Sequence, residues 1–389
     1  MANFAEDFIR LCLRLNKHIP GLVDSYFGPD EFKIEVDAEE IVPLPELRED
    51  CRELMEAART EDGDHYLSVY REKQVDALAA QIDRLSEPAK DYYAYVHRLF
   101  DIDLAPVPEQ AIDDYHQKIK ALLRELGHEG RLGDTLLRWE ESNYVSGDEL
   151  EGLIASVCRD ARKRTRQIIP LPRSEKVTIE MVRSKPWSGY NWYQGRYRSL
   201  IQVNLDLPRT RFEAEDLAHH EAYPGHHTDH SSKEKALYRE RRLLETSIML
   251  INTPVSVLSE GIASVAGKFI SPPNVDDARR LATLVRELRR ACDSNATIKL
   301  HADNAGVSTV AEYLEKRGLM SHQRVTKRLE FLTNSLWSSY SFTYWFGSRI
   351  VENAYERAKI AGVTQEFFKL LYTEPLVPTT LEERLRKLC

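Results

Sequence analysis

The sequence predicts a mainly α-helical protein with one small β-sheet placed just before a histidine-rich helix. Apolar residues recur at helical spacing over most of the 389 residues, which is typical of amphipathic helices packed around a core. One region, 168–208, instead alternates β-branched and polar residues, as strands do. Directly after it comes AEDLAHHEAYPGHHTDH (214–230), which holds five of the twelve histidines.

Residues 1–165 are expected to form a helical N-terminal lobe, and residues 166–389 a catalytic lobe with the small sheet and the histidine helix. Both lobes are expected to belong to one continuous compact fold. The amphipathic segments of the first lobe are 4–17, 45–59, 66–85, 88–99, 108–127 and 147–167.

The small sheet is expected to contain two or three short strands. VTIEMV and SLIQVNLDLP are β-branched and alternating, and an aromatic, glycine-containing connection lies between them. Residues 185–195 of this connection could form the wall of a groove, and the strand 199–208 could pair with an extended peptide in it.

The sequence predicts both where the histidine helix begins and where it is interrupted. Thr210 and Glu213 fit a capping box at its N-terminus. Three turns later Pro224 has no N–H to donate, and its ring clashes with the carbonyl of His220. Gly225 then supplies a residue that tolerates a positive φ. The helix is therefore expected to kink or bulge at Pro224-Gly225.

This bulge would restore a metal-binding spacing. His220-Glu221 begins an H-E-x-x-H motif, but Pro224 stands where the second histidine should be. In a straight helix His226 would lie about 120° and about 9 Å from His220. With Pro224 and Gly225 looped out, His226 regains the position of a second ligand. A different bulge would place His227 there instead. His230, one turn beyond His226, could support a metal ligand or face the substrate.

These residue types suit one Zn²⁺ ion. Two imidazoles and one carboxylate leave a position open for water, whose pKa the ion lowers. Glu221, directly after the first histidine, cannot reach the metal but can accept the proton of the water.

Glu260 is the favoured third ligand. It is the only charged residue in PVSVLSEGIASVAG (254–267), and a buried carboxylate must be paired or metal-bound. The small residues around it would let this helix pack closely against another. The rival is Glu245, but Arg241 and Arg242 lie near it in the sequence, which favours a salt bridge for this glutamate.

The motifs HEAYPGHH (220–227) and SEGIAS (259–264) resemble the bacterial domain-of-unknown-function family 885, whose members read H-E-A-x-P-G-H-H-L-Q and then E-G-W-A-x-Y-x-E. The resemblance implies the mostly helical, zincin-like fold of bacterial H-E-x-x-H metallocarboxypeptidases, with the active site in a groove. The ligands it implies are His220, His226 and Glu260, with Glu221 as the base.

The sequence departs from this family at several positions. Thr228-Asp229 replace Leu-Gln, Ile262 replaces the tryptophan, Val265 the tyrosine and Gly267 the second glutamate. Further along, Tyr344 stands where the family has a tyrosine before its glycine. A phenol there could donate to a developing oxyanion, with Tyr340 as the alternative. Arg349 could bind a substrate carboxylate.

The sequence therefore predicts a zinc-dependent hydrolase, foremost a metallopeptidase acting on a peptide or small amide. The alternatives are a hydrolase of non-peptide amides and an inactive metal-binding or interaction protein. A net charge of −8 argues against nucleic acid or an anionic membrane as the main partner. Because five scattered cysteines form no C-x-x-C, and no apolar run reaches a bilayer's width, a cytoplasmic location is expected.

Overall fold

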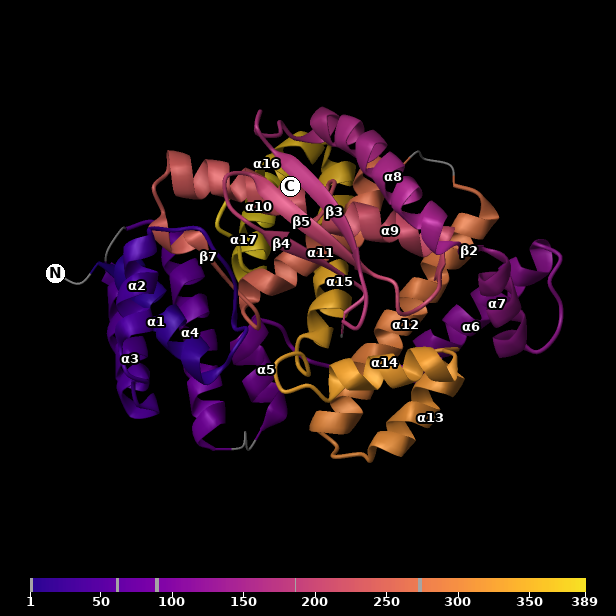
Figure 1. Cartoon of the computed structure of the whole chain (residues 1–389), viewed down its shortest axis with the longest axis horizontal. Coiled ribbons are helices and arrows are strands. Elements are labelled where there is room, and N and C mark those ends of the chain that lie inside the picture. The colour runs from indigo at the N-terminus through magenta and orange to yellow at the C-terminus, as the bar shows by residue number, and fades with distance from the viewer. Residues whose placement is uncertain (1–2, 61–62, 88–90, 186, 272–274) are drawn as a thin grey trace.

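The computed structural model describes residues 3–60, 63–87, 91–185, 187–271 and 275–389, and it is mainly α-helical, as the sequence predicts. Helices α1–α4 lie at one end of the molecule and α6 and α7 at the other, with the central helices and the small sheet between them (Figure 1). The helices of the first part are α1 (Phe4–His18), α2 (Asp30–Ala38), α3 (Leu44–Thr60), α4 (His65–Ser86), α5 (Tyr92–Phe100), α6 (Glu109–Glu125), α7 (Leu132–Ser142) and α8 (Gly147–Ile168).

The second part continues the helical pattern. Its helices are α9 (Arg211–Glu221), α10 (His226–Lys233), α11 (Pro254–Ile270), α12 (Asp277–His301), α13 (Val307–Arg317), α14 (His322–Leu332), α15 (Ser341–Ala361), α16 (Thr364–Thr373) and α17 (Pro378–Leu388). Helix α10 continues into a π-helical segment, η1 (Glu234–Glu240), and a short 3₁₀ turn, η2 (Leu244–Ser247), follows. Within the described ranges, no helix combines the length and apolar character that a bilayer crossing needs.

Most predicted helices are found within a few residues of their expected bounds, but two were missed. Helices α2 and α7 are short, and α2 buries only Phe32 and Val36, so its apolar periodicity is weak. The predicted helix 88–99 corresponds to α5, which begins after Asp91, whose side chain accepts from the backbone N–H of Tyr93 and Ala94. Residues 88–90 lie outside the described residues.

The expected small sheet is three-stranded, with β5 (Arg198–Asn204) in the middle. It pairs in parallel with β3 (Lys176–Val182) and antiparallel with β4 (Gly189–Tyr193). The prediction of a single sheet was wrong, because β1 (Val23–Tyr26) also pairs with β7 (Ile248–Leu250), and β2 (Tyr144–Val145) with β6 (Arg209–Thr210). These strands are too short to show alternation in the sequence.

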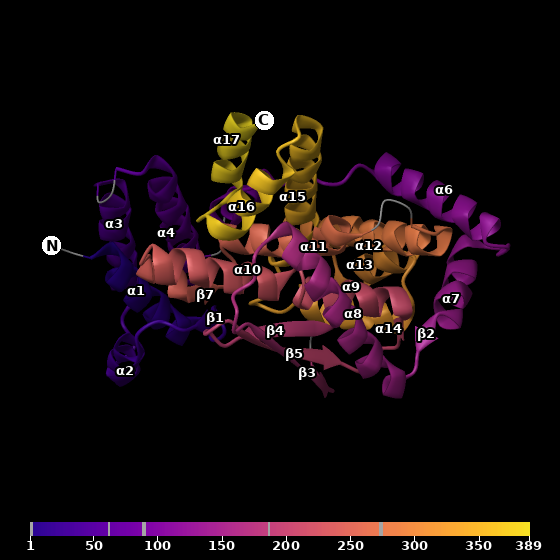
Figure 2. The same ribbon diagram turned by 90° about the horizontal axis from the view of Figure 1, so that it is seen from above.

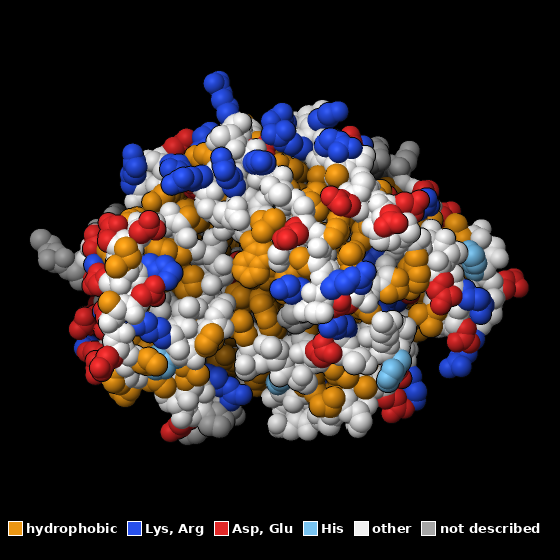
Figure 3. Space-filling view, in the orientation of Figure 1, with side chains coloured by type: hydrophobic (Ala, Val, Ile, Leu, Met, Phe, Trp, Pro, Cys, Tyr) orange, Lys and Arg blue, Asp and Glu red, His pale blue; other side chains and the backbone are white. Residues whose placement is uncertain are grey.

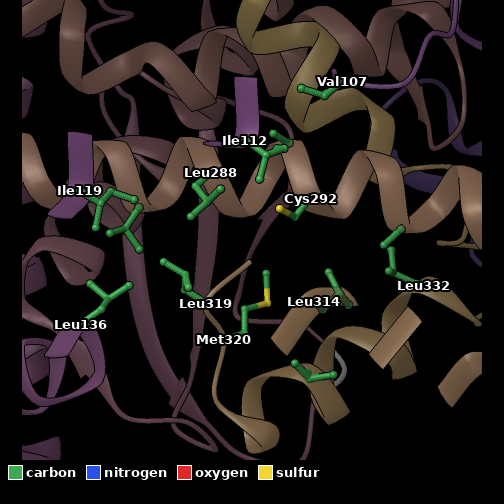
Figure 4. Close-up of a cluster of buried hydrophobic side chains, with 14 of the residues drawn as sticks. Val107, Ile112, Ile119, Leu136, Leu288, Cys292, Leu314, Leu319, Met320 and Leu332 are labelled. Atoms are coloured by element: carbon green, nitrogen blue, oxygen red, sulfur yellow. The ribbon is translucent and has the colours of Figure 1, made fainter. Parts of the chain in front are cut away.

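The three-stranded sheet lies along one side of the molecule, and α15, α16 and α17 project from the other (Figure 2). Helices α9 and α11 lie between these layers, and nearly every residue of α11 is buried. The largest hydrophobic cluster surrounds α12 and includes Leu288 and Cys292 of that helix, with Leu136 and Leu314 packed against them (Figure 4). This packing holds α12 rigidly beside the layer that carries the histidines.

The face with the three-stranded sheet carries charges of both signs. Basic side chains gather along its upper edge in Figure 3, and acidic side chains gather over α1–α3.

The division of the chain into two lobes, 1–165 and 166–389, stays a prediction.

Candidate metal centre

The helix break predicted between His220 and His226 is present. The capping box forms: Thr210 accepts from the backbone N–H of Glu213, and the Glu213 side chain accepts from the N–H of Thr210. Helix α9 ends at Glu221, and α10 begins at His226. Two helices therefore carry the two histidines, with Pro224 and Gly225 in the connection.

Gly225 is needed because the space around it is small. Its φ is −74°, so the tolerance of a positive φ that glycine offers is not used here. A Cβ atom at this position would lie 1.9 Å from the carbonyl oxygen of His220 and 2.4 Å from that of His219. The backbone N–H of Gly225 donates to the latter carbonyl at 3.0 Å. The start of α10 thus lies directly against the last turn of α9, where no side chain fits.

Two tyrosines hold this connection, one on α16 and one within the connection itself. Tyr372 on α16 donates a hydrogen bond to the carbonyl of Pro224 at 2.7 Å. Tyr223 donates to the buried carboxylate of Glu175, which also lies 3.1 Å from Nε2 of His227. The break is therefore fixed by side chains from distant parts of the sequence.

The structure brings His220, His226 and Glu260 together. One ligand atom from each lies within 4.8 Å of the other two. Nε2 of His220 is 3.2 Å from Oε2 of Glu260, and Nε2 of His226 is 3.6 Å from Oε1. A tetrahedral zinc ion with bonds of about 2.0–2.1 Å would separate its ligand atoms by about 3.3 Å. The two measured separations, 3.2 and 3.6 Å, are close to that value, so this donor set suits a zinc ion.

Hydroxyl groups support two of the three. Tyr340 donates to Oε1 of Glu260 at 2.8 Å, and Oγ of Ser259 lies 3.2 Å from Nδ1 of His226. Such partners fix the orientation of metal-binding side chains and tune their affinity. Tyr340, which the sequence offered as an alternative oxyanion donor, instead contacts the carboxylate.

The charges of these side chains shift one another's pKa values. Burial disfavours the charged form of His226, but the carboxylate of Glu260 outweighs it and raises the pKa of His226 to about 9. Burial likewise opposes ionisation of Glu260, yet His226 and His220 lower the pKa of this carboxyl well below its usual value. Without a metal ion, His226 and Glu260 therefore form a buried ion pair.

Glu221 lies beside this group and is buried. Burial raises the pKa of its carboxyl, and the charge of Glu260 adds to that shift. The side-chain amide of Asn191 on β4 donates to the Glu221 carbonyl at 2.6 Å, so the sheet holds the end of α9. The ring of Tyr344 lies 6.3 Å from that of His220, and burial raises the pKa of its phenol, which keeps it protonated.

The rival ligands lie elsewhere. His227 is buried between Ser199 and Glu175, with its Nδ1 2.8 Å from the Ser199 hydroxyl. Glu245 pairs with Arg71 at 2.7 Å rather than with the arginines beside it in the sequence. His230 stacks on His226, with ring centroids 5.5 Å apart, and its Nε2 lies 3.4 Å from Ser259 Oγ.

Two cavities meet at His220 and Glu221. One of about 340 Å³ is lined by Trp187, Arg209 and Tyr344 among others. The other, of about 140 Å³, is lined by His226, Glu260 and Tyr190. The connection predicted as a groove wall thus contributes Trp187 and Tyr190, while its Pro186 lies outside the described residues.

Sequence reasoning missed Asp24 on β1. Tyr190 donates to its carboxylate, and burial raises the pKa of Asp24 to about 6. Asp24 lines the smaller cavity with the histidines. No local pattern marks it, because it reaches the site only through the pairing of β1 with β7.

The positions that depart from the family motif have separate environments. Ile262 is packed in a hydrophobic cluster with α15 and α16. Val265 and Gly267 line a larger cavity of about 1000 Å³, which also reaches His220. Asp229 is buried and paired with Lys233 at 2.6 Å.

Comparison with known proteins identifies the fold but no activity. No family model and no curated protein matches the sequence. Among solved structures, the chain is similar to "the putative lipoprotein from Colwellia psychrerythraea", with a TM-score of 0.63 and 17% identity over 88% of this chain and 66% of that one. It is also similar to "a putative lipoprotein of unknown function from Shewanella oneidensis", with a TM-score of 0.58 and 14% identity over 88% and 72%. The chain thus spans just under two thirds of the first neighbour. The resemblance to family 885 stays a prediction that rests on two motifs.

Proposed function

We propose that this protein is a zinc-dependent hydrolase and, within that class, a metallopeptidase that acts on peptides or small amides. The convergence of His220, His226 and Glu260 carries the proposal, because two imidazoles and one buried carboxylate at these distances suit a catalytic zinc site. Three protein ligands leave a coordination position free.

His220, His226 and Glu260 would hold the ion, with Ser259 and Tyr340 orienting the second histidine and the carboxylate. When bound, zinc would supply Lewis acidity, lowering the pKa of water and polarising a carbonyl group.

Glu221 would accept the proton of the attacking water and later return it to the leaving amine. Its raised pKa suits both steps, because a general base works best when its pKa approaches the working pH. Tyr344 would donate its phenolic hydrogen to the oxygen on which negative charge develops. Both side chains line the cavity of about 340 Å³, where a substrate can reach them.

The test is Glu221→Gln in the zinc-loaded protein. The amide keeps the size of the side chain but cannot accept the proton. Zinc content should be unchanged, and hydrolysis of a peptide library should fall by about 10²–10⁴-fold. Metal analysis and mass spectrometry of the products measure the two effects.

Hydrolysis that persists in Glu221→Gln would contradict the role of this carboxylate. Absence of hydrolysis by zinc-loaded wild type, across both peptide and non-peptide amides, would favour the alternative of a metal-binding or interaction protein.

The cytoplasmic location remains part of the proposal. It rests on the five cysteines, all of which are free thiols. The names of the two structural neighbours suggest a lipid-anchored setting for those proteins.

A further inference from the structure

The cavity beside Glu221 has the opposite charge from the protein as a whole. Six basic and two acidic side chains line this 340 Å³ space, although the chain has a net charge of −8. The acidic ones are Glu221 and Asp293. The basic ones are Arg209, Arg289, Arg290, Arg324, Lys327 and Arg328.

Four of the six basic side chains are neutralised by a carboxylate at short distance. These pairs are Arg289 with Glu140 at 2.6 Å, Arg324 with Glu213 at 2.8 Å, Lys327 with Glu330 at 3.0 Å and Arg328 with Asp293 at 3.0 Å. These four ion pairs form part of the cavity wall. Arg209 and Arg290 differ from the other four basic residues because neither has a carboxylate partner of its own.

Arg209, on β6, has no carboxylate within ion-pair distance among the described residues. One of its terminal nitrogens, Nη2, donates to the carbonyls of Ser188 and Asn204, which fixes the guanidinium at the end of the sheet. Its Nε is buried without a hydrogen-bond partner in the described chain. Burial lowers the pKa of Arg209, and Arg324 adds to that shift, while the carboxylates of Glu213 and Glu221 oppose it from beyond ion-pair distance. Arg209 therefore has carboxylates nearby but no direct ion pair among the described residues.

Arg290, on α12, is nearly as isolated. Its side chain is 13% exposed, and its only ion pair among the described residues is with Glu287, one turn away, at 3.5 Å. That carboxylate also pairs with Arg286 and Arg349. Burial lowers the pKa of Arg290 and Arg286 adds to the shift, while the carboxylates of Glu287, Asp216 and Glu260 partly offset it. Three guanidinium groups therefore share the single carboxylate of Glu287.

We propose that Arg209 and Arg290 bind a carboxylate of the substrate, beside the metal centre. A buried guanidinium is costly when it has no direct ion pair, as with Arg209, or only a shared one, as with Arg290. A site that keeps both is suited to an anionic ligand. Guanidinium groups bind carboxylates through paired, directional hydrogen bonds. The proposal rests on the proposed peptidase function, which makes the carboxylate either the C-terminus of a peptide or an Asp or Glu side chain.

The position of this pair relates it to the chemistry. Both arginines line the same cavity as His220, Glu221 and Tyr344. Apolar side chains of the same cavity, such as Trp187 and Phe331, would contact the aliphatic part of a residue whose carboxylate the arginines hold. Arg349, the sequence-based candidate for this role, is already paired with Glu287 and Glu352.

The first experiment measures carboxylate binding without the metal, to which a carboxylate could otherwise bind. Succinate is titrated into the metal-free protein at low ionic strength, and the Kd is measured by calorimetry or NMR. The double variant Arg209→Gln/Arg290→Gln should bind succinate at least tenfold more weakly than wild type. The control Arg52→Gln removes an exposed charge, 61% exposed, and should bind as wild type does.

Absence of succinate binding by wild type, or a Kd within twofold of wild type in the double variant, would overturn the proposal. If the glutamine variant fails to fold, Arg209→Lys/Arg290→Lys replaces it. The lysines keep the charge but lose the paired donors, so binding should weaken at least threefold. An unchanged Kd overturns the proposal in that case as well.

The second experiment identifies the source of the carboxylate. Zinc-loaded Glu221→Gln protein, with and without the arginine substitutions, is titrated with N-acetyl-Ala-Ala-Ala, with its C-terminal amide and with N-acetyl-Ala-Glu-Ala-amide. Dependence on the arginines for the first peptide alone assigns the site to a C-terminal carboxylate. Dependence for the third alone assigns it to an acidic side chain.

The two proposals can fail separately. Arginine-dependent succinate binding without any Glu221-dependent peptide hydrolysis would retain the carboxylate site and remove the peptidase function. Glu221-dependent hydrolysis that is indifferent to both arginines would retain the peptidase and remove the carboxylate site.

Discussion

At the scale of residues, two tyrosines one helical turn apart have different roles. Tyr340 donates its hydrogen bond to Glu260, whereas Tyr344 lines the 340 Å³ cavity beside His220 and Glu221. Both phenols stay protonated, because burial raises the pKa of each well above its usual value. Tyr340 therefore positions a proposed ligand, and Tyr344 is available to the substrate.

Phenylalanine substitutions separate these roles. Tyr340→Phe removes the hydrogen bond that orients Glu260, so zinc affinity should fall by about 10–100-fold. Tyr344→Phe should leave zinc affinity unchanged and lower kcat for a hydrolysed peptide. Competition with a chromophoric chelator measures the first effect, and steady-state kinetics the second. Equal zinc affinity in wild type and Tyr340→Phe would contradict the positioning role.

The sequence predicted some residues of the site and not others, for a physical reason. His220, Glu221 and His226 lie in one segment whose capping box and proline reveal its local geometry. Glu260 stood out as the only charged residue between Pro254 and Gly267. Asp24 and Arg209 carry no such local mark, because tertiary contacts alone bring them to the site.

At the scale of elements, the contact between α11 and α15 places Glu260 opposite the tyrosines. The helices meet at Gly261 and Gly347: a Cβ on Gly347 would lie 2.2 Å from the carbonyl oxygen of Val257. A Cβ on Gly261 would lie 2.4 Å from the Gly347 carbonyl oxygen. The small residues of α11 thus permit the close approach predicted from them.

Gly347→Ala should therefore destabilise the protein. The added methyl group would meet backbone that cannot move aside without separating the helices, at a cost of about 1–3 kcal/mol. The matched control is Gly152→Ala in α8, where nothing lies within 4 Å of the new methyl group. That change should stabilise by about 0.5–1 kcal/mol, because alanine favours helix. Urea unfolding of both variants measures the difference, and equal stabilisation would refute the close contact.

The sequence predicted helices correctly where the apolar periodicity extends over many residues. The apolar periodicity of α1, α3 and α8 marks each of them within a few residues. It failed for the short β1 and β7, which depend on pairing with each other across more than 200 residues. The sequence also did not reveal why a glycine stands at position 225, since the constraint there is space and not φ.

At the scale of the whole molecule, the centre is assembled from segments spread over most of the chain. Asp24 comes from β1, the histidines from α9 and α10, Glu260 from α11 and Tyr344 from α15. Metal binding should therefore stabilise the entire fold rather than one helix, because the unfolded chain does not hold these groups together.

Zinc should accordingly raise Tm. At a free zinc concentration of 100 times Kd, the native state gains about 2.7 kcal/mol. Glu260→Gln should lose most of this zinc-dependent shift. Glu245→Gln should keep it, although losing the buried pair with Arg71 lowers Tm in the absence of zinc. Differential scanning calorimetry with and without zinc distinguishes the two glutamates, and the reverse pattern would make Glu245 the ligand.

The hydrogen bond from Tyr372 to Pro224 has a consequence for when the metal centre can form during translation. The ribosome makes both histidines and Glu260 more than 100 residues before Tyr372. A nascent chain that already contains every proposed zinc ligand still lacks the phenol that holds the turn between the two imidazoles. Metal loading in the cell should therefore be completed only after translation of α16, and a premature stop codon shortly before that helix would yield a product with a loosened centre.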